Sequence, residues 1–356
     1  MTKLFLPPGP VPVPDFVREA MNRPVFHHRT AEFGELVHDV FTGLQYLFQT
    51  ESHTGIMIGS GTFGVETGMY SLFRNRDKVI IINNGKFSSR WVEYAEVLGL
   101  EVLELRLDWG EVPTFESISD LAGPDIPQGI ILTHCETSTG ALTDLEPLAL
   151  QLRDTWPDIC ILADTITSTG SLPFYLDEWG IDAAVTASQK ALMNPAGIVC
   201  FGISERGMSR LQPTRPGDFA NWYNYVEAAR SLSFPYTPPL LGIYGIQAAL
   251  NHIRQKGLPA IWNQVHRCSR RFKQEIEKIG GSVCGTFPSD SLTAFQWNSG
   301  TAGELQQHLL NRHIELAGGQ GIWQGKILRM SHMGSSATMP IVEEVLAALR
   351  EYSPRN

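Results

Sequence analysis

One lysine in this sequence lies where its side chain could act as a nucleophile. Lys190 follows a short apolar run at residues 181–185 and precedes a second one at residues 198–203. A lysine between two buried strands loses hydration, which lowers its pKa and makes the neutral amine a usable nucleophile toward a carbonyl carbon. The alternative is a surface lysine in a turn, and the local sequence alone favours that alternative.

Polar residues follow neighbouring apolar runs in the same way. Asp164 comes directly after a run that ends at Ala163, so we expect a partly buried carboxylate that needs a partner, such as a protonated pyridine nitrogen. Ser60-Gly61-Thr62 stands between a predicted strand and a predicted helix, where free backbone N–H groups suit a phosphate. A helix cap for Asp164 and an ordinary Gly-Ser turn are the structural alternatives.

Two further strand ends carry weaker candidates. Phe87 could stack on a flat ring, although a core aromatic is the commoner explanation. Thr137 lies in a hydroxyl-rich run that could bind polar groups or form turns, and Cys135 beside it is only a minor candidate nucleophile. Taken together, a lysine, an aspartate and a phosphate-type turn at strand ends outline a pyridoxal phosphate site, in which the lysine forms a Schiff base and the aspartate keeps the ring nitrogen protonated.

The elements that must position these residues alternate along the chain. Apolar runs separated by helical patterns predict strands at residues 56–58, 79–82, 102–105, 129–133, 159–163, 183–185 and 198–203. Such alternation is typical of an α/β fold, a mostly parallel sheet sandwiched by helices. Functional groups of these folds gather at the carboxyl ends of the strands, where the candidates above are placed.

We expect three parts in the chain. Residues 1–14 form an extended N-terminal segment because prolines disfavour a helix there, and Asp15 is the predicted N-cap of the first helix. Residues 15–245 form a large cofactor-binding domain, and residues 246–356 form a linking helix and a small α+β domain.

The composition excludes several classes of function. The 356 residues carry a net charge of −9, which argues against a nucleic-acid or anionic-membrane partner. No apolar segment approaches the ~18 residues of a membrane span, and the N-terminus does not read as a signal peptide. The 5 cysteines are far apart and form no metal-ligand or disulfide pattern. We therefore predict a cytoplasmic protein without a metal site.

Several runs, in order and spread over nearly the whole chain, resemble the class V aminotransferases. These are fold-type I pyridoxal phosphate enzymes, and the resemblance is to the alanine–glyoxylate and serine–glyoxylate (or serine–pyruvate) group. The more specific runs are S-Q-K-A-L at residues 188–192 and L-R-M-S-H-M-G at residues 328–334. The supporting runs are Pro8-Gly9-Pro10 and residues 28–33, 59–62, 132–134, 136–140 and 163–164.

The resemblance implies a role for each matching residue. Lys190 would bind the cofactor covalently and then move a proton, Asp164 would pair with the pyridine nitrogen, and Phe87 would stack on the ring. Arg329 would clamp the substrate α-carboxylate, since its planar fork donates two parallel hydrogen bonds. The remaining ligands are Ser60, Gly61, Thr62 and Gln189 for the phosphate, Thr137 for the phenolic oxygen, and Thr237 for the phosphate of a neighbouring subunit.

Because Thr237 would bind the phosphate of a neighbouring subunit, the resemblance implies a homodimer with shared active sites. Three positions depart from the family pattern: Pro8 replaces a glycine, Phe234 a tyrosine and Ala196 a proline. None of them removes a catalytic group, but they leave the identity of the substrate open.

The predicted reaction is transfer of an amino group from a small amino acid, of the alanine or serine type, to a 2-oxo acid such as glyoxylate or pyruvate. We see no second basic residue that calls for a dicarboxylate. A pyridoxal phosphate lyase of the desulfurase kind is the alternative, but neither Cys268 nor Cys284 lies in an evident glycine-rich loop. A non-catalytic subunit that keeps the fold is the third reading, which retention of Lys190, Asp164 and Arg329 disfavours.

Overall fold

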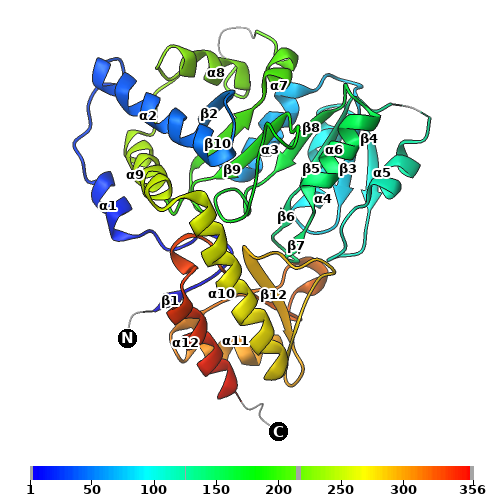
Figure 1. Cartoon of the computed structure of the whole chain (residues 1–356), viewed down its shortest axis with the longest axis vertical. Coiled ribbons are helices and arrows are strands. Elements are labelled where there is room, and N and C mark those ends of the chain that lie inside the picture. The colour runs from blue at the N-terminus through cyan, green and yellow to red at the C-terminus, as the bar shows by residue number, and fades with distance from the viewer. Residues whose placement is uncertain (1–2, 125, 214–217, 353–356) are drawn as a thin grey trace.

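The computed structural model describes residues 3–124, 126–213 and 218–352, and it has a large and a small lobe. The large lobe is built on a seven-stranded sheet and the small one on a four-stranded sheet (Figure 1). The long helix α10 (Leu258–Lys278) runs from the first lobe along the second. Among the described residues, no helix has the length and apolar character needed to cross a bilayer.

The large sheet has the strand order β2-β10-β9-β8-β5-β3-β4. Adjacent strands in this sheet are parallel, except that β10 is antiparallel to both β2 and β9. The strands are β2 (His53–Ile58), β3 (Lys78–Asn83), β4 (Glu101–Arg106), β5 (Gly129–Thr133), β8 (Cys160–Asp164), β9 (Ala183–Ala187) and β10 (Ile198–Ile203). The predicted α/β class is confirmed, and each of the predicted strands is present.

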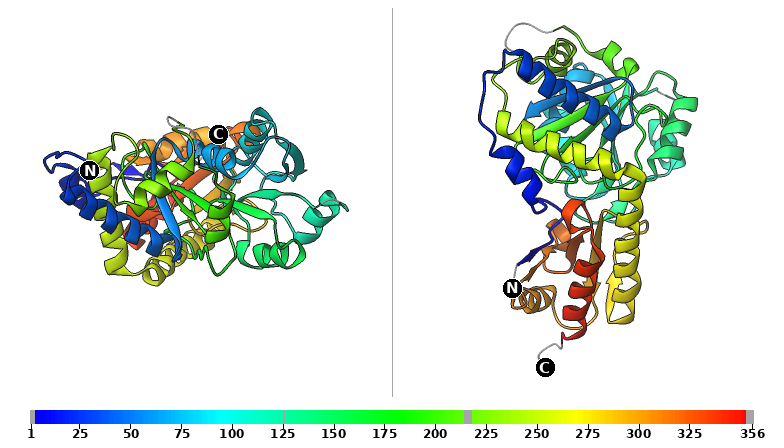
Figure 2. Two further views of the ribbon diagram at one scale, coloured as in Figure 1. Left: turned by 90° about the horizontal axis from the view of Figure 1, so that it is seen from above. Right: turned by 60° about the vertical axis from the view of Figure 1, so that its left-hand side comes forward.

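The sheet is apolar because helices cover both of its faces. Every residue of the central strands β5, β8, β9 and β10 is buried, as their continuous apolar sequences require. Figure 2 shows the sheet between its helices. The helices of this lobe are α1 (Asp15–Met21), α2 (Ala31–Phe48), α3 (Gly61–Leu72), α4 (Ser88–Val97), α5 (Phe115–Ala122), α6 (Leu145–Thr155), α7 (Glu205–Arg210), α8 (Trp222–Arg230) and α9 (Leu240–Lys256).

The predicted N-cap of the first helix is wrong by one residue. Pro14 is the N-cap of α1 and Asp15 is its first helical residue. The carboxylate of Asp15 instead forms an ion pair with Arg18, one turn later. Its negative charge also interacts favourably with the positive end of the helix dipole.

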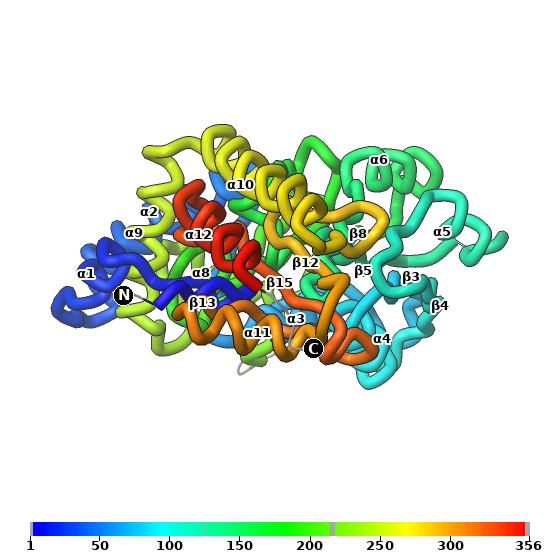
Figure 3. Tube along the Cα trace, turned by 90° about the horizontal axis from the view of Figure 1, so that it is seen from below, coloured from blue at the N-terminus to red at the C-terminus, as the bar shows by residue number. Residues whose placement is uncertain are grey.

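The small lobe has its own core. Its sheet has the order β11-β12-β15-β14, and α12 packs alongside α10 over it (Figure 3). Phe272, Phe295 and Leu346 are fully buried there. The elements are β11 (Gly281–Val283), β12 (Leu292–Trp297), α11 (Ala302–Leu310), β13 (Ile314–Glu315), β14 (Ala317–Gly318), η1 (Gly321–Trp323), β15 (Leu328–Ser331), η2 (Gly334–Ser336) and α12 (Met339–Arg350).

The N-terminal segment links the two lobes (Figure 2, right). Strand β1 (Leu4–Phe5) pairs in parallel with β13 of the small lobe. Farther along, the Val11 N–H donates to the Gln189 carbonyl oxygen at 2.9 Å, next to the candidate lysine. Of the predicted extended segment, the first two residues lie outside the described residues. The predicted boundaries after residues 14 and 245 remain predictions.

Candidate active site

Lys190 lies in the turn that follows β9 at the carboxyl edge of the sheet. Its side chain is buried, and Nζ donates a hydrogen bond to the carbonyl oxygen of Pro8. Burial lowers the pKa of this lysine to about 8, the charge of Arg329 acts in the same direction, and Asp164 opposes both. The amine therefore has the low basicity that a nucleophile at neutral pH requires.

Asp164 ends the neighbouring strand β8 and is buried as well. Burial raises the pKa of its carboxyl to about 7, although the Ile166 N–H, at 3.0 Å from Oδ1, favours the charged form. Nearby Glu136 raises this pKa further and Lys190 lowers it. A cation placed against Asp164 would restore the ionised form, and a protonated pyridine nitrogen is such a cation.

The start of α3 supplies free N–H groups. Ser60 is the N-cap and its hydroxyl accepts from the Phe63 N–H at 3.3 Å, while the N–H groups of Gly61 and Thr62 have no partner within the helix. A Cβ at Gly61 would lie 2.6 Å from the side chain of Ile166, so glycine lets the helix approach the segment after β8. This places an anion-binding helix end beside the carboxyl edge.

The side chain of Gln189 has an unpartnered polar atom next to Lys190. Its side-chain oxygen Oε1 is buried and has no hydrogen-bond partner. Buried polar atoms are nearly always partnered, so an atom of this kind beside Lys190 indicates a polar group that binds there.

Arg329, in β15 of the small lobe, reaches the same place. Its Nη1 donates to the Thr137 carbonyl oxygen at 2.9 Å, and Nε and Nη2 donate to the Gly318 carbonyl oxygen at 3.0 and 2.8 Å. Burial lowers the pKa of the guanidinium to about 10, so it stays charged at neutral pH. The Thr137 hydroxyl lies 3.1 Å from that of Thr167. A fixed guanidinium in a buried site suits a carboxylate ligand.

The other predicted residues are placed less centrally. Phe87 is the half-buried N-cap of α4, with the Arg90 guanidinium 5.0 Å from its ring centroid. Thr237 is exposed between α8 and α9, and no hydrogen bond among the described residues joins it to the group around Lys190. The structure thus brings together Lys190, Asp164 and Arg329 within one chain, but not Thr237.

The three positions that depart from the family pattern, Pro8, Phe234 and Ala196, lie in different surroundings. Pro8 contributes its carbonyl oxygen to Lys190, and this atom does not depend on the side chain. Phe234 is buried and packs edge-on against Tyr225 at 5.8 Å between ring centroids. Ala196 is exposed.

The cysteines do not have the properties of nucleophiles. Cys135 is buried, its Sγ lies 3.4 Å from the Ser291 hydroxyl, and burial raises the pKa of its thiol. Cys268 is buried in α10, and burial raises the pKa of the Cys284 thiol to about 11. The minor prediction for Cys135 gains no support, and neither late cysteine has the low pKa of a reactive thiol.

Sequence reasoning missed two features of the site. Gly9 has a φ of +105°, and a Cβ there would lie 2.2 Å from Nζ of Lys190. Glu136 is a fully buried carboxylate that accepts hydrogen bonds from the backbone around Phe87. Glycine in a proline-rich run could have signalled the first; nothing in the local sequence signals the second.

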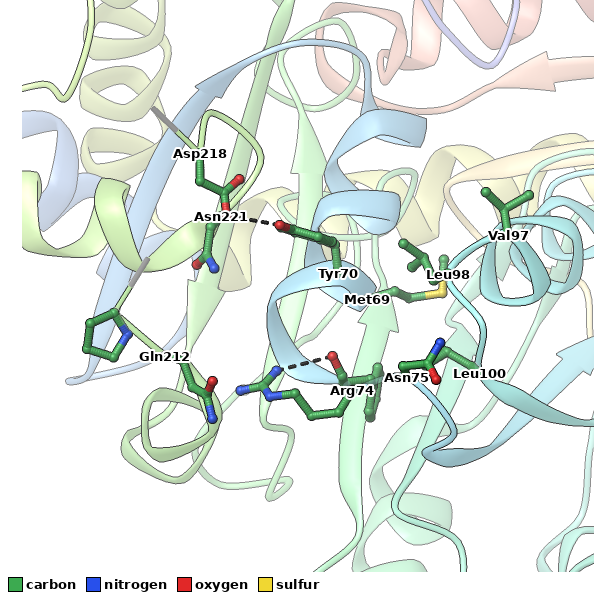
Figure 4. A pocket seen from close by; sticks show the side chains of 12 residues that line it. Met69, Tyr70, Arg74, Asn75, Val97, Leu98, Leu100, Gln212, Asp218 and Asn221 are labelled. Atoms are coloured by element: carbon green, nitrogen blue, oxygen red, sulfur yellow. Dashed lines mark hydrogen bonds between the residues drawn. The ribbon is translucent and has the colours of Figure 1, made fainter. Parts of the chain in front are cut away.

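An open pocket of about 700 Å³ lies elsewhere. Tyr70 of α3, Arg74, Val97 of α4 and Asp218 are among its lining residues, and the Tyr70 hydroxyl donates to Asp218 at 3.0 Å (Figure 4). Arg74 precedes β3, so this pocket is toward the amino ends of the strands. None of the predicted site residues lines it.

The residues at the carboxyl edge fit pyridoxal phosphate. The low-pKa amine of Lys190 suits its aldehyde. The carboxyl of Asp164 suits its protonated ring nitrogen, and the unpartnered atoms at the start of α3 and at Gln189 suit its phosphate. No group of three or more potential metal-ligating side chains occurs in the described part of the chain.

Comparisons with known proteins agree with this fit. Residues 17–339 match the family described as aminotransferase class-V. The chain is 31% identical to an L-aspartate–glyoxylate aminotransferase of Paracoccus denitrificans (strain Pd 1222), with 92% of this chain and 85% of that protein covered.

Two solved structures are similar over nearly their whole length. An aspartate aminotransferase from Thermus thermophilus has a TM-score of 0.92 and 31% identity, covering 98% of both chains. An alanine–glyoxylate aminotransferase from Nostoc sp. has a TM-score of 0.92 and 30% identity, covering 99% of this chain and 95% of that one. A cysteine desulfurase from Thermococcus onnurineus NA1 has a TM-score of 0.77 and 15% identity, covers 95% of this chain and 91% of its own, and shares the fold alone.

Replacing Gly9 by alanine is expected to weaken cofactor capture, because the new Cβ would lie 2.2 Å from Nζ and would displace the end of the Lys190 side chain. Spectroscopic titration of cofactor-free protein with pyridoxal phosphate measures this. The matched control is Gly303→Ala in α11, where the nearest heavy atom would be 3.9 Å away. Equal capture by both variants would contradict the crowding at Gly9.

The pKa of Lys190 predicts the pH dependence of cofactor capture. Only the neutral amine attacks an aldehyde, so the rate should rise with pH and level off above about 8, rather than above the ordinary lysine value of 10.5. Asp164→Asn should move the midpoint to lower pH, because the carboxylate favours the ammonium form. Stopped-flow absorbance across this range checks both; a midpoint near 10 in the wild type would contradict the burial argument.

Proposed function

The chain belongs to the class-V aminotransferase family, and from this premise we propose that it transfers an amino group from a small amino acid, of the alanine or serine type, to a 2-oxo acid such as glyoxylate or pyruvate. It is a pyridoxal phosphate-dependent enzyme, as its family membership and structural relatives imply. The observation that carries the proposal is the buried, low-pKa amine of Lys190, on which the charges of both Asp164 and Arg329 act.

Pyridoxal phosphate, when bound, supplies an electron sink that stabilises negative charge on the substrate carbon beside the amino group. In the proposed mechanism Lys190 Nζ would take a proton from the α-carbon of the amino acid and pass it to the aldehyde carbon of the cofactor in the first half-reaction. In the second half-reaction it would move a proton in the reverse direction, to the α-carbon that comes from the 2-oxo acid. Its lowered pKa suits the task, since a general base works best with a pKa near the operating pH.

The other residues hold the reacting groups in place. Asp164 lies where its carboxylate would keep a ring nitrogen protonated, and the start of α3 with Ser60, Gly61 and Thr62 would bind the phosphate. Gln189 would add a side-chain contact to the phosphate, Phe87 would support the ring, and Thr137 would lie by the phenolic oxygen. Each role remains a proposal.

Arg329 would fix the substrate by its α-carboxylate. The two carbonyl oxygens that already accept from it, those of Thr137 and Gly318, hold the guanidinium between the lobes. One carboxylate clamp serves both the amino acid and the 2-oxo acid, which is what two half-reactions through one site require.

The names of two relatives favour a second donor. The relatives from Paracoccus denitrificans and Thermus thermophilus are named for aspartate. A panel of alanine, serine and aspartate against glyoxylate and pyruvate distinguishes the donors, with the 2-oxo product measured in each reaction. Turnover with alanine or serine supports the main proposal, exclusive turnover with aspartate supports the second donor, and ammonia or sulfide release without transfer would contradict transamination.

We expect Lys190→Ala to have no measurable turnover in this panel, whereas Arg329→Lys should mainly raise KM for donor and acceptor. A lysine keeps the charge but loses the second parallel hydrogen bond, so an increase of about tenfold or more in KM is expected. Cofactor absorbance measured in parallel should be unchanged by Arg329→Lys. Loss of cofactor and of substrate binding to the same extent would contradict the role given to Arg329.

We also propose a cytoplasmic homodimer with shared sites. Thr237 is exposed in a segment flanked by the exposed apolar side chains of Phe219, Leu232 and Leu241, which suits a subunit interface at this place. The 5 cysteines are free, as a reducing compartment favours. Sedimentation of the active enzyme should give a dimer, and Thr237→Ala should weaken binding of pyridoxal phosphate. An active monomer would contradict the shared site.

A further inference from the structure

Glu136 is a buried carboxylate for which the proposed mechanism has no use. Its side chain is fully buried, and among the described residues it has no ion-pair partner. Burying an unpaired charge is costly, so a carboxylate in this state must be stabilised by several hydrogen bonds. Glu136 lies one residue before Thr137 at the edge of the candidate site, so its hydrogen bonds could hold site residues in place.

All of the hydrogen-bond partners of Glu136 are donors. Oε2 accepts from the backbone N–H groups of Ser88 at 2.8 Å and of Phe87 at 3.2 Å. Oε1 accepts from the Ser138 N–H at 2.9 Å and from the Ser138 hydroxyl at 2.6 Å. A carboxylate satisfies four such donors, whereas an amide of the same shape would turn an NH₂ group toward one pair of them.

These bonds fasten the start of α4 to the turn that carries Thr137. Phe87, the N-cap of α4, has no side-chain cap of its own, so Glu136 supplies both the hydrogen bonds and the negative charge that a helix start favours. The loop before α4 is pressed against this carboxylate: a Cβ at Gly85 would lie 2.4 Å from Cγ of Glu136. The Lys86 N–H also donates to the Ser138 hydroxyl at 2.9 Å.

The same turn holds Arg329. The Thr137 carbonyl oxygen accepts from Nη1 of Arg329, and the charge of Glu136 raises the pKa of that guanidinium against the effect of burial. Glu136 is therefore joined to Phe87 through hydrogen bonds and to Arg329 through one intervening residue and an electrostatic interaction.

We propose that Glu136 is a positioning residue that fixes the ring-supporting Phe87 and the carboxylate-binding Arg329 in one frame around Lys190. This inference rests on the proposed function, because it takes Phe87 and Arg329 as the groups that meet the cofactor ring and the substrate carboxylate. Glu136 itself does not touch the reacting atoms in this account; it acts through the backbone of its neighbours.

The test compares Glu136→Gln with the wild-type holoenzyme. The expected results are a reduced visible circular dichroism of bound pyridoxal phosphate, about tenfold weaker cofactor binding or more, and a KM for the amino donor that rises more than kcat falls. Glu304→Gln is the matched control: Glu304 also accepts from backbone at a helix start, the Thr301 N–H at 2.8 Å, but in the small lobe. It should leave all three readouts unchanged.

Ser138→Ala keeps the test decisive if Glu136→Gln does not fold. It removes one hydroxyl donor to Glu136 and should shift the dichroism and KM in the same direction by a smaller factor. A lower melting temperature with unchanged dichroism, cofactor affinity and KM in either variant would overturn the inference, since that is the result of a merely structural role. A wild-type protein that binds no pyridoxal phosphate would overturn the proposed function itself. Failure of the proposed function is thus distinguished from failure of the role given to Glu136.

Discussion

The rest of the structure depends on the burial of one amine. Removing Lys190 from water lowers its pKa to about 8, and this requires a site assembled from segments far apart in the chain. The parallel strands bring β8 and β9 side by side, so that Asp164 and Lys190 end at the same edge of the sheet. The apolar strands and their covering helices bury the side chains at that edge.

The two lobes meet at the amine. The N-terminal segment leaves the small lobe at β1 and reaches Lys190 with the Pro8 carbonyl oxygen, and β15 brings Arg329 from the same lobe. The buried charges of Arg329 and Asp164 act on the pKa of Lys190 in opposite directions. A shift of one lobe against the other would thus change both the access to the lysine and its basicity.

Sequence reasoning could predict the features whose signals are local. Asp164 and Lys190 directly follow or lie between apolar runs, and the alternation of strands and helices fixes the edge at which they meet. The proline-rich run could mark Gly9 as unusual but could not show what it contacts, because the crowding at Gly9 comes from Lys190, far along the chain. Glu136 was missed for a similar reason: its partners Phe87 and Ser88 belong to another loop, and no spacing rule connects them. The role proposed for Thr237 requires a second copy of the chain, so no pattern within one chain predicts its contacts.

We propose Lys190 as the residue to which pyridoxal phosphate attaches. The direct measurement is borohydride reduction of the holoenzyme, followed by proteolysis and mass spectrometry of the peptides. We expect a single modified peptide that contains residues 188–192, with the added mass on Lys190. A modified lysine elsewhere, or no modified peptide from a protein saturated with pyridoxal phosphate, would contradict it.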